Sequence, residues 1–194
     1  MGGVDKGLQI FQGQALVDIA LQRLRQQAGG APGLIAINAN RNLADYAARQ
    51  VPVWSDTVPD FAGPLAGFLA ALRQCQGRFE WLLSVPCDSP LFPLDVLQRL
   101  AAAASAQQAD IAMALAPEVQ PDGSSVLRPQ PVFCLMRTGL ADSLQNFIDG
   151  GGRKIGAWTA SHMQTKVPFG MPGDDARAFA NANTLDELHA LEKL

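Results

Sequence analysis

Short runs of strand-forming residues alternate with helical segments along the first half of the chain, and this alternation constrains the fold more than any other feature. The strand-like runs are residues 34–38, 51–54 and 81–85, and the segments with helical periodicity are 15–28, 42–49, 64–74 and 94–106. Parallel strands need crossover connections, and a helix is the compact way to make one. The sequence therefore predicts an α/β fold with a mostly parallel sheet covered by helices on both faces.

The run "WLLSV" at 81–85 is continuously apolar, which is typical of a strand buried on both faces. Beyond residue 110 the regularity weakens. There we expect strands at 110–115, 131–136 and 165–169, a loop or hairpin between the first two, and a helix carrying Leu140, Leu144 and Ile148. A last helix is expected to start at Thr184 with a capping box to Glu187.

Composition limits the class of protein. The 194 residues, 48% hydrophobic and 17% charged, suit a single globular domain spanning 1–194. A net charge of -3 without a long basic block argues against nucleic-acid binding. Three cysteines without a CxxC pair argue against a disulfide framework or a zinc site and for a reducing compartment. No apolar run reaches about 18 residues, so we expect a cytoplasmic protein that spans no membrane.

Polar side chains follow three of the expected strands. Asn38, Asp56 and Asp88 each come directly or shortly after an apolar run, and "GPLAG" (Gly63 to Gly67) opens the neighbouring helix. Each of these residues alone is a common turn former. Ligands of open α/β sheets bind beyond the carboxyl ends of the strands, so together the residues predict one shared crevice.

Asp88 is the strongest candidate in this crevice. A carboxylate between prolines, after the most apolar strand, suits a divalent ion that bridges phosphates. Its neighbour Cys87 is interpreted as a small buried residue rather than a nucleophile, because the two histidines, His162 and His189, lie far away in sequence. The stretch "GGGRK" is either a helix end followed by solvated cations or a flexible segment that brings Arg153 and Lys154 to a phosphate.

Several motifs together carry a resemblance to a known family. "MGGVDKG", "NANR", "SD", "GPLAG", "PCD" and "NANT" occur in the order and spacing of the molybdenum cofactor guanylyltransferases. The resemblance covers nearly the whole chain and implies a Rossmann-like three-layer α/β/α sandwich. It also implies transfer of GMP from GTP to molybdopterin-bound molybdenum cofactor, with Mg²⁺ required and pyrophosphate released, and leaves open cofactor-delivery proteins as partners.

The resemblance also assigns residues to the two substrates. Lys6, Asn38, Asp56 and Asp88 match the residues that bind GTP, together with Gly63 and Gly67, and Asp88 matches the magnesium ligand. Residues 1–100 would form the nucleotide-binding half and residues 101–194 the acceptor-binding half. Candidate acceptor-binding residues in the second half are Arg153, Lys154, Asn181 and Asn183.

The first residues match the end of a glycine-rich loop that, in the family, follows a strand. We therefore expect the encoding DNA upstream of the first codon to specify a β-rich run, a glycine pair and basic residues. Backbone N–H groups of such a turn would hold phosphates.

Other functions remain open from sequence alone. A molybdopterin cytidylyltransferase or a sugar-phosphate nucleotidyltransferase would share the architecture and differ in the base pocket or the acceptor half. A non-catalytic nucleotide- or pterin-binding carrier is an alternative of another class. A P-loop NTPase is disfavoured because "GGVDKG" lacks the GK[ST] ending.

Overall fold

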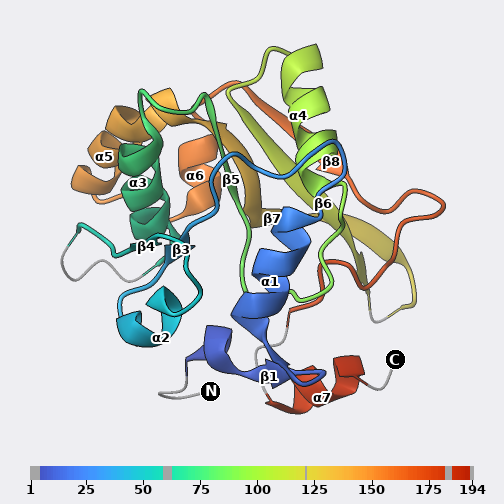
Figure 1. The fold of residues 1–194 in the computed structure, drawn as a ribbon. Helices are drawn as coiled ribbons and strands as arrows, with labels where there is room; N and C mark the ends of the chain where they lie inside the picture. The colour runs from blue at the N-terminus through green and yellow to red at the C-terminus, as the bar shows by residue number, and fades with distance from the viewer. Residues whose placement is uncertain (1–4, 59–62, 121, 182–184, 193–194) are drawn as a thin grey trace.

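The computed structural model describes residues 5–58, 63–120, 122–181 and 185–192. Helices cover both faces of a central sheet (Figure 1). The α-helices are α1 (Leu16–Arg25), α2 (Leu43–Ala47), α3 (Pro64–Cys75), α4 (Val96–Ala106), α5 (Ala141–Asp149), α6 (Ile155–Thr159) and α7 (Leu185–Glu192). Two 3-10 helices are η1 (Lys6–Leu8) and η2 (Thr138–Leu140).

The described strands fall into three groups. The strands are β1 (Ile10–Phe11), β2 (Gln14–Ala15), β3 (Ile37–Asn38), β4 (Val53–Trp54), β5 (Trp81–Ser84), β6 (Ile111–Val119), β7 (Ser125–Arg137) and β8 (Gln164–Pro168). β1 and β2 form a small hairpin, β3 and β4 pair in parallel, and the main sheet has the order β5-β7-β6-β8.

The expectation of a mostly parallel sheet is corrected by this pairing. β7 runs antiparallel to both β5 and β6, whereas β6 and β8 are parallel. The antiparallel pair arises because β6 and β7 form one long hairpin, the alternative left open for the linker between them. Strand alternation with helices could not reveal this direction, since a hairpin needs no crossover.

The core is divided by the sheet into two layers. α3, α5 and α6 pack Leu69, Leu144 and Trp158 against one face of β7, where Cys134 and Met136 point. The opposite face, which includes Phe133 and Leu135 of β7, is covered mainly by α4. This alternation along β7 is the period of two expected of a sheet buried on both faces. The predicted helical faces of α3 and α5 are therefore confirmed as core.

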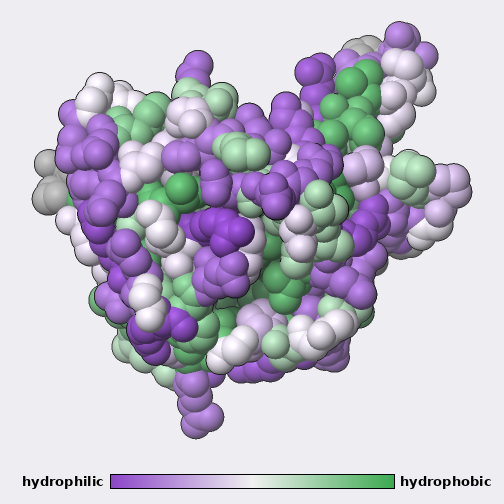
Figure 2. Space-filling model, turned by 90° about the horizontal axis from the view of Figure 1, so that it is seen from above, coloured by the Kyte–Doolittle hydropathy of each residue, from purple (hydrophilic) through white to green (hydrophobic). Residues whose placement is uncertain are grey.

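The hairpin of β6 and β7 extends beyond the body of the molecule (Figure 1). Val119, Val126 and Leu127 of this hairpin are exposed, and Figure 2 shows hydrophobic atoms on an arm that projects from the body. In the described part of the chain, no helix has both the length and the hydropathy needed to cross a membrane.

Candidate functional site

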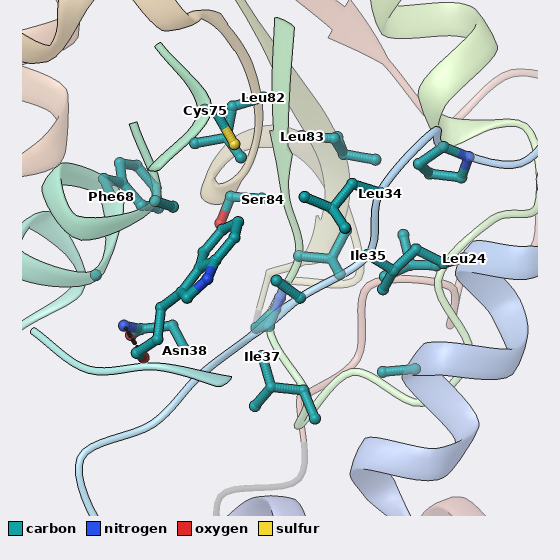
Figure 3. A pocket seen from close by; sticks show the side chains of 18 of the residues that line it. Leu24, Leu34, Ile35, Ile37, Asn38, Phe68, Cys75, Leu82, Leu83 and Ser84 are labelled. Atoms are coloured by element: carbon teal, nitrogen blue, oxygen red, sulfur yellow. Dashed lines mark hydrogen bonds between the residues drawn. The ribbon is translucent and has the colours of Figure 1, made fainter. Parts of the chain in front are cut away.

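β3 and β5 border an apolar cavity rather than pairing with each other. The cavity has a volume of about 470 Å³ and is lined by Ile35 and Ile37 on one side and by Leu82 and Leu83 on the other. Figure 3 shows Leu82 and Leu83 on opposite sides of β5, with Ile35 and Ile37 on the neighbouring segment of chain. All four residues of β5 are half-buried, and Leu82 and Leu83 pack against core clusters on opposite faces of the strand. The expectation of a strand covered on both faces is therefore met in its packing, and the remaining exposure lies along the edge of β5 that borders the cavity.

The polar residues predicted from the strand ends gather at the rim of this cavity in two clusters. Asn38, Gly67, Tyr46 and Cys87 line the cavity. Asn38 belongs to the first cluster with Asp56, and Cys87 adjoins Asp88 of the second. The rim therefore collects the ends of β3, β4 and β5, as the crevice rule predicts.

In the first cluster two amides hold the carboxylate of Asp56. Asn38 Nδ2 donates to Asp56 Oδ1 at 3.0 Å, and Asn40 Nδ2 donates to Asp56 Oδ2 at 2.7 Å. The backbone N–H of Asp56 donates to Asn40 Oδ1 at 2.8 Å. Asn38 also donates to the carbonyl of Trp54 at 3.0 Å, which ties β3 to β4. Each carboxylate oxygen keeps a further lone pair, so Asp56 is fixed in orientation and can still accept hydrogen bonds.

Gly67 of α3 lies against this cluster. A Cβ atom at this position would lie 2.5 Å from Asn38 Oδ1. A contact that short does not occur in real structures, so only glycine lets Asn38 keep its place. Gly63, just before α3, has a φ of 149°, a conformation that L side chains rarely adopt.

In the second cluster Lys6 and Asp88 form an ion pair. Lys6 Nζ donates to Asp88 Oδ2 at 3.0 Å, although the two residues are 82 positions apart. Their side chains are 38% and 19% exposed, so a ligand can reach both. Lys6 lies in η1 and Asp88 follows β5, so the fold places a cation and a carboxylate at one point of the rim.

Cys87 has the environment of a structural thiol. Burial, followed by the nearby carboxylates of Asp88 and Asp5, raises the pKa of Cys87 to about 11. A thiol with a raised pKa stays protonated and is a poor nucleophile. His162 is bonded to Ser143 Oγ at 2.9 Å beside Trp158, in the α5–α6 region. The prediction that Cys87 is not a nucleophile agrees with both observations.

The candidate acceptor residues do not form one cluster among the described residues. Arg153 donates to the carbonyl of Ile148 at 3.1 Å and to that of Gly152 at 2.8 Å, so it closes the end of α5. Lys154 is the N-cap residue of α6. Asn181 instead accepts a hydrogen bond from buried Ser89, next to Asp88. Asn183, like Thr184 of the expected capping box, lies outside the described residues.

The residues that fix η1 were not predictable from the sequence. Asp5 and Tyr46 are joined by a 2.5 Å hydrogen bond across 41 positions of the chain. Asn42 adds a second hydrogen bond to Asp5, at 2.9 Å. The only available sequence signal was that Asp5 directly precedes Lys6, and nothing in the sequence indicates its pairing with Tyr46.

The possible fit of a metal follows from the donor set. In the described ranges, no three His, Cys, Asp or Glu side chains gather into a cage for a metal ion. Mg²⁺ is commonly held by one or two carboxylates together with substrate phosphates and water. Asp88 is partly exposed and lies beside a lysine, so it suits this mode of binding, in which a single carboxylate holds the ion together with phosphates and water.

Comparison with known proteins shows the family of the chain. The MobA-like NTP transferase domain matches residues 1–165. The molybdenum cofactor guanylyltransferase of Acidovorax sp. (strain JS42) is 57% identical over 195 residues, covering 100% of this chain and 90% of the relative. The chain belongs to the molybdenum cofactor guanylyltransferase family. The enzyme of that name from Cupriavidus metallidurans is 51% identical over 192 residues, covering 99% of this chain and 88% of the relative.

Solved structures show that the fold of this guanylyltransferase family member is shared more widely. The molybdopterin-guanine dinucleotide biosynthesis protein A of Archaeoglobus fulgidus superposes with a TM-score of 0.74 at 20% identity, covering 98% of this chain and 90% of that one. A 4-diphosphocytidyl-2C-methyl-D-erythritol synthase superposes with a TM-score of 0.68 at 13% identity, covering 97% and 93%. The α/β nucleotidyltransferase fold is thereby confirmed, with a mixed sheet.

Proposed function

We propose that this guanylyltransferase binds GTP along the rim of the cavity and transfers GMP to a phosphate of molybdopterin-bound molybdenum cofactor. The observation that carries the proposal is the arrangement of two clusters on one rim. Asn38 and Asp56 offer oriented acceptors at one place, while Lys6 and Asp88 offer a cation and a carboxylate at another. A nucleotide needs both kinds of group, one for its base and one for its phosphates.

Asp56 is assigned to guanine recognition. Guanine presents an N1–H and an amino group side by side, and a carboxylate can accept from both, whereas adenine lacks that pattern. The two amides that hold Asp56 are neutral donors, so they orient the carboxylate without supplying a compensating charge. Gly67 keeps Asn38, and through it Asp56, in place.

Lys6 and Asp88 are assigned to the reacting phosphates. In the reaction an oxygen of the acceptor phosphate attacks the α-phosphorus of GTP, a new P–O–P linkage forms, and the bond to the β-phosphate breaks to release pyrophosphate. Negative charge grows on the phosphate oxygens, and Lys6 would stabilise it. A magnesium ion held by Asp88 would supply further charge neutralisation. The attacking phosphate is already ionised, so no general base is required.

The residues proposed to bind the acceptor do not lie together in one cluster. Arg153, Lys154, Asn181 and Asn183 remain the candidate contacts for the pterin in the half formed by residues 101–194. Asn181 is the best supported of these candidates, because its hydrogen bond with Ser89 places it beside the loop that carries Asp88. The enzyme would work in the cytoplasm, where cofactor-delivery proteins could supply the acceptor.

Nucleotide selectivity tests the base assignment. Calorimetric titration with GTP, ATP and CTP in the presence of Mg²⁺ should show preferred binding of GTP. Asp56→Ala should reduce that preference about tenfold or more, because the hydrogen-bonding partner of N1–H and the amino group is removed. Ser55→Ala is the matched control, since Ser55 directly follows the same strand and its hydroxyl donates to the carbonyl of Ala39 at 2.9 Å.

Three outcomes would contradict the proposal. Equal affinity for the three nucleotides would overturn guanine recognition, and a preference for CTP would indicate a cytidylyltransferase. Nucleotide binding without pyrophosphate release, measured with the molybdenum cofactor present, would favour a carrier.

A further inference from the structure

The residue before Lys6 is held more firmly than a surface aspartate usually is. Asp5 is the N-cap residue of η1, and its Oδ1 accepts from the backbone N–H of Gly7 at 3.2 Å. The same carboxylate accepts from Tyr46 Oη at 2.5 Å and from Asn42 Nδ2 at 2.9 Å, and it lies 3.6 Å from Arg41 Nε. Its side chain is only 13% exposed. A cap alone would need just the first of these contacts.

The partner of Asp5 is itself rigid. Tyr46 is buried in α2 and packs in a cluster with Val17, Leu21 and Ile37. Its hydroxyl lies so close to η1 that a Cβ atom on Gly7 would approach it to 2.5 Å. Close approach to η1 and packing against this cluster restrict the ring, which also lines the cavity. Tyr46 therefore offers Asp5 a fixed point of attachment.

This attachment bears on the next residue along the chain. Lysine carries a charge at the end of a flexible four-carbon stem, so its ammonium can occupy many positions unless the backbone below it is fixed. The Nζ atom of Lys6 nevertheless meets Asp88 at 3.0 Å, from an η1 of only three residues. The backbone of that short helix needs an external support, and the contacts of Asp5 supply one.

We infer that Asp5, held by hydrogen bonds from Tyr46 and Asn42, is a positioning residue. It keeps Lys6 at the part of the cavity rim where the phosphates of GTP are proposed to bind. Asp5 touches no reacting atom in this scheme and acts only through Lys6. The inference rests on the role proposed above for Lys6. It adds a residue that the strand-end pattern does not indicate, together with the tyrosine on which that residue depends.

A double-mutant cycle separates positioning from general support of the fold. Lys6→Ala and Asp5→Ala are each expected to lower kcat by about tenfold or more, with Tyr46→Phe intermediate because its ring is kept. Combining Asp5→Ala with Lys6→Ala should cost no more than Lys6→Ala alone, since without the lysine there is nothing to position. The affinity for magnesium pyrophosphate, measured by calorimetry, should show the same non-additive losses in the variants, and this measurement involves no turnover.

A control for stability is available at the other end of α2. Arg49 donates to Asp18 at 3.0 and 3.1 Å and so ties the end of α2 to α1. Asp18→Ala breaks a similar attachment without touching η1, and it should leave kcat and pyrophosphate affinity unchanged for the folded fraction. The unfolding temperature of every variant is measured so that rates refer to folded enzyme.

Three results would count against parts of this scheme. If the losses from Asp5→Ala and Lys6→Ala multiply in the double variant, Asp5 does not act through Lys6. Full kcat and pyrophosphate affinity in folded Asp5→Ala and Tyr46→Phe, with Lys6→Ala impaired, would overturn the positioning role alone. An unimpaired Lys6→Ala would instead overturn the phosphate role of Lys6, and the inference with it.

Discussion

The carboxylates of Asp88 and Asp56, at the rim of the cavity, have different partners. The difference suits the binding of phosphates at one and of a base at the other. Asp88 faces the ammonium of Lys6, whereas Asp56 is held by the neutral amides of Asn38 and Asn40. A carboxylate beside a cation can exchange that partner for a metal ion and phosphates. A carboxylate fixed by amides keeps its orientation and has lone pairs left for hydrogen-bond donors on a ligand.

Replacing Asp88 tests this division. Asp88→Asn is nearly isosteric at a loop position, so the fold should survive, but turnover should fall about 10²-fold or more and depend less on magnesium concentration. Asp142→Asn is the control, because it removes an exposed carboxylate that pairs with Arg73 on the surface at 2.6 Å. Full turnover of Asp88→Asn at limiting magnesium would show that Asp88 serves only the turn after β5 and holds no metal.

Asp5 gives a prediction for the pH dependence of stability. Burial opposes its ionisation, but hydrogen bonds from Tyr46, Asn42 and Gly7 outweigh burial and hold the pKa of Asp5 below its ordinary value of 3.8. A carboxyl with a depressed folded-state pKa stabilises the protein above its unfolded pKa and loses that contribution as pH falls. The free energy of unfolding of the wild type should exceed that of Asp5→Asn near neutral pH, and the difference should shrink below about pH 4. Urea titrations at several pH values measure it, and a pH-independent difference would contradict the linkage.

Among the elements, helices were easier to predict than strands. The apolar spacing of α3 and α5 sets one buried face, and the structure buries Leu65, Leu69 and Leu144 accordingly. Of the run 34–38 only Ile37–Asn38 forms a strand, because its sole described partner, β4, is equally short. The antiparallel direction of β6 and β7 follows from the hairpin that joins them, which the sequence pattern alone did not distinguish from a loop.

At the start of α3, the contact between Gly67 and Asn38 gives a prediction for one helix position. Gly67→Ala should favour the helix itself, since alanine has the higher helix propensity. It should nevertheless weaken GTP binding, because the new methyl would lie 2.5 Å from Asn38 Oδ1 and would displace that side chain. Gly156→Ala in α6 is the matched control, as nothing lies within 4 Å of its added Cβ. Calorimetry should show weaker GTP binding only for Gly67→Ala, and unchanged affinity in both variants would contradict the steric role.

For the whole molecule, the site residues were predictable from the sequence where strand ends bring them together. Asn38, which is hydrogen-bonded to Asp56, and Cys87, which adjoins Asp88, line the same cavity because β3, β4 and β5 all end near it. The clamp of Asp5 by Tyr46 was not predictable, since it joins a loop and a helix that no strand order connects. Nor was the cavity, which depends on how far β3 and β5 stand apart.

That cavity has the features of a position for one more strand. Among the described residues, β3 pairs only with β4 and β5 only with β7, so each presents one edge to the apolar space between them. Unpaired edges accept a further strand, and strands in such sheets are about 5–6 residues long. The described chain starts beside this space, because Asp5 is bonded to Tyr46, one of the lining residues.

A strand supplied at this position should therefore stabilise the protein and improve its phosphate site. We expect that extending the N-terminus by an apolar, β-branched run and a glycine-containing turn raises the unfolding temperature. Each kcal/mol gained corresponds to about 2–4 °C in a domain of this size. The turn would also bring backbone N–H groups to the phosphates near Lys6, so GTP should bind more tightly. A Gly/Ser extension of equal length is the control, since it offers hydrogen-bonding groups without apolar side chains to fill the cavity. If both extensions behave like the starting chain in thermal unfolding and GTP titration, the space between β3 and β5 is not a strand position.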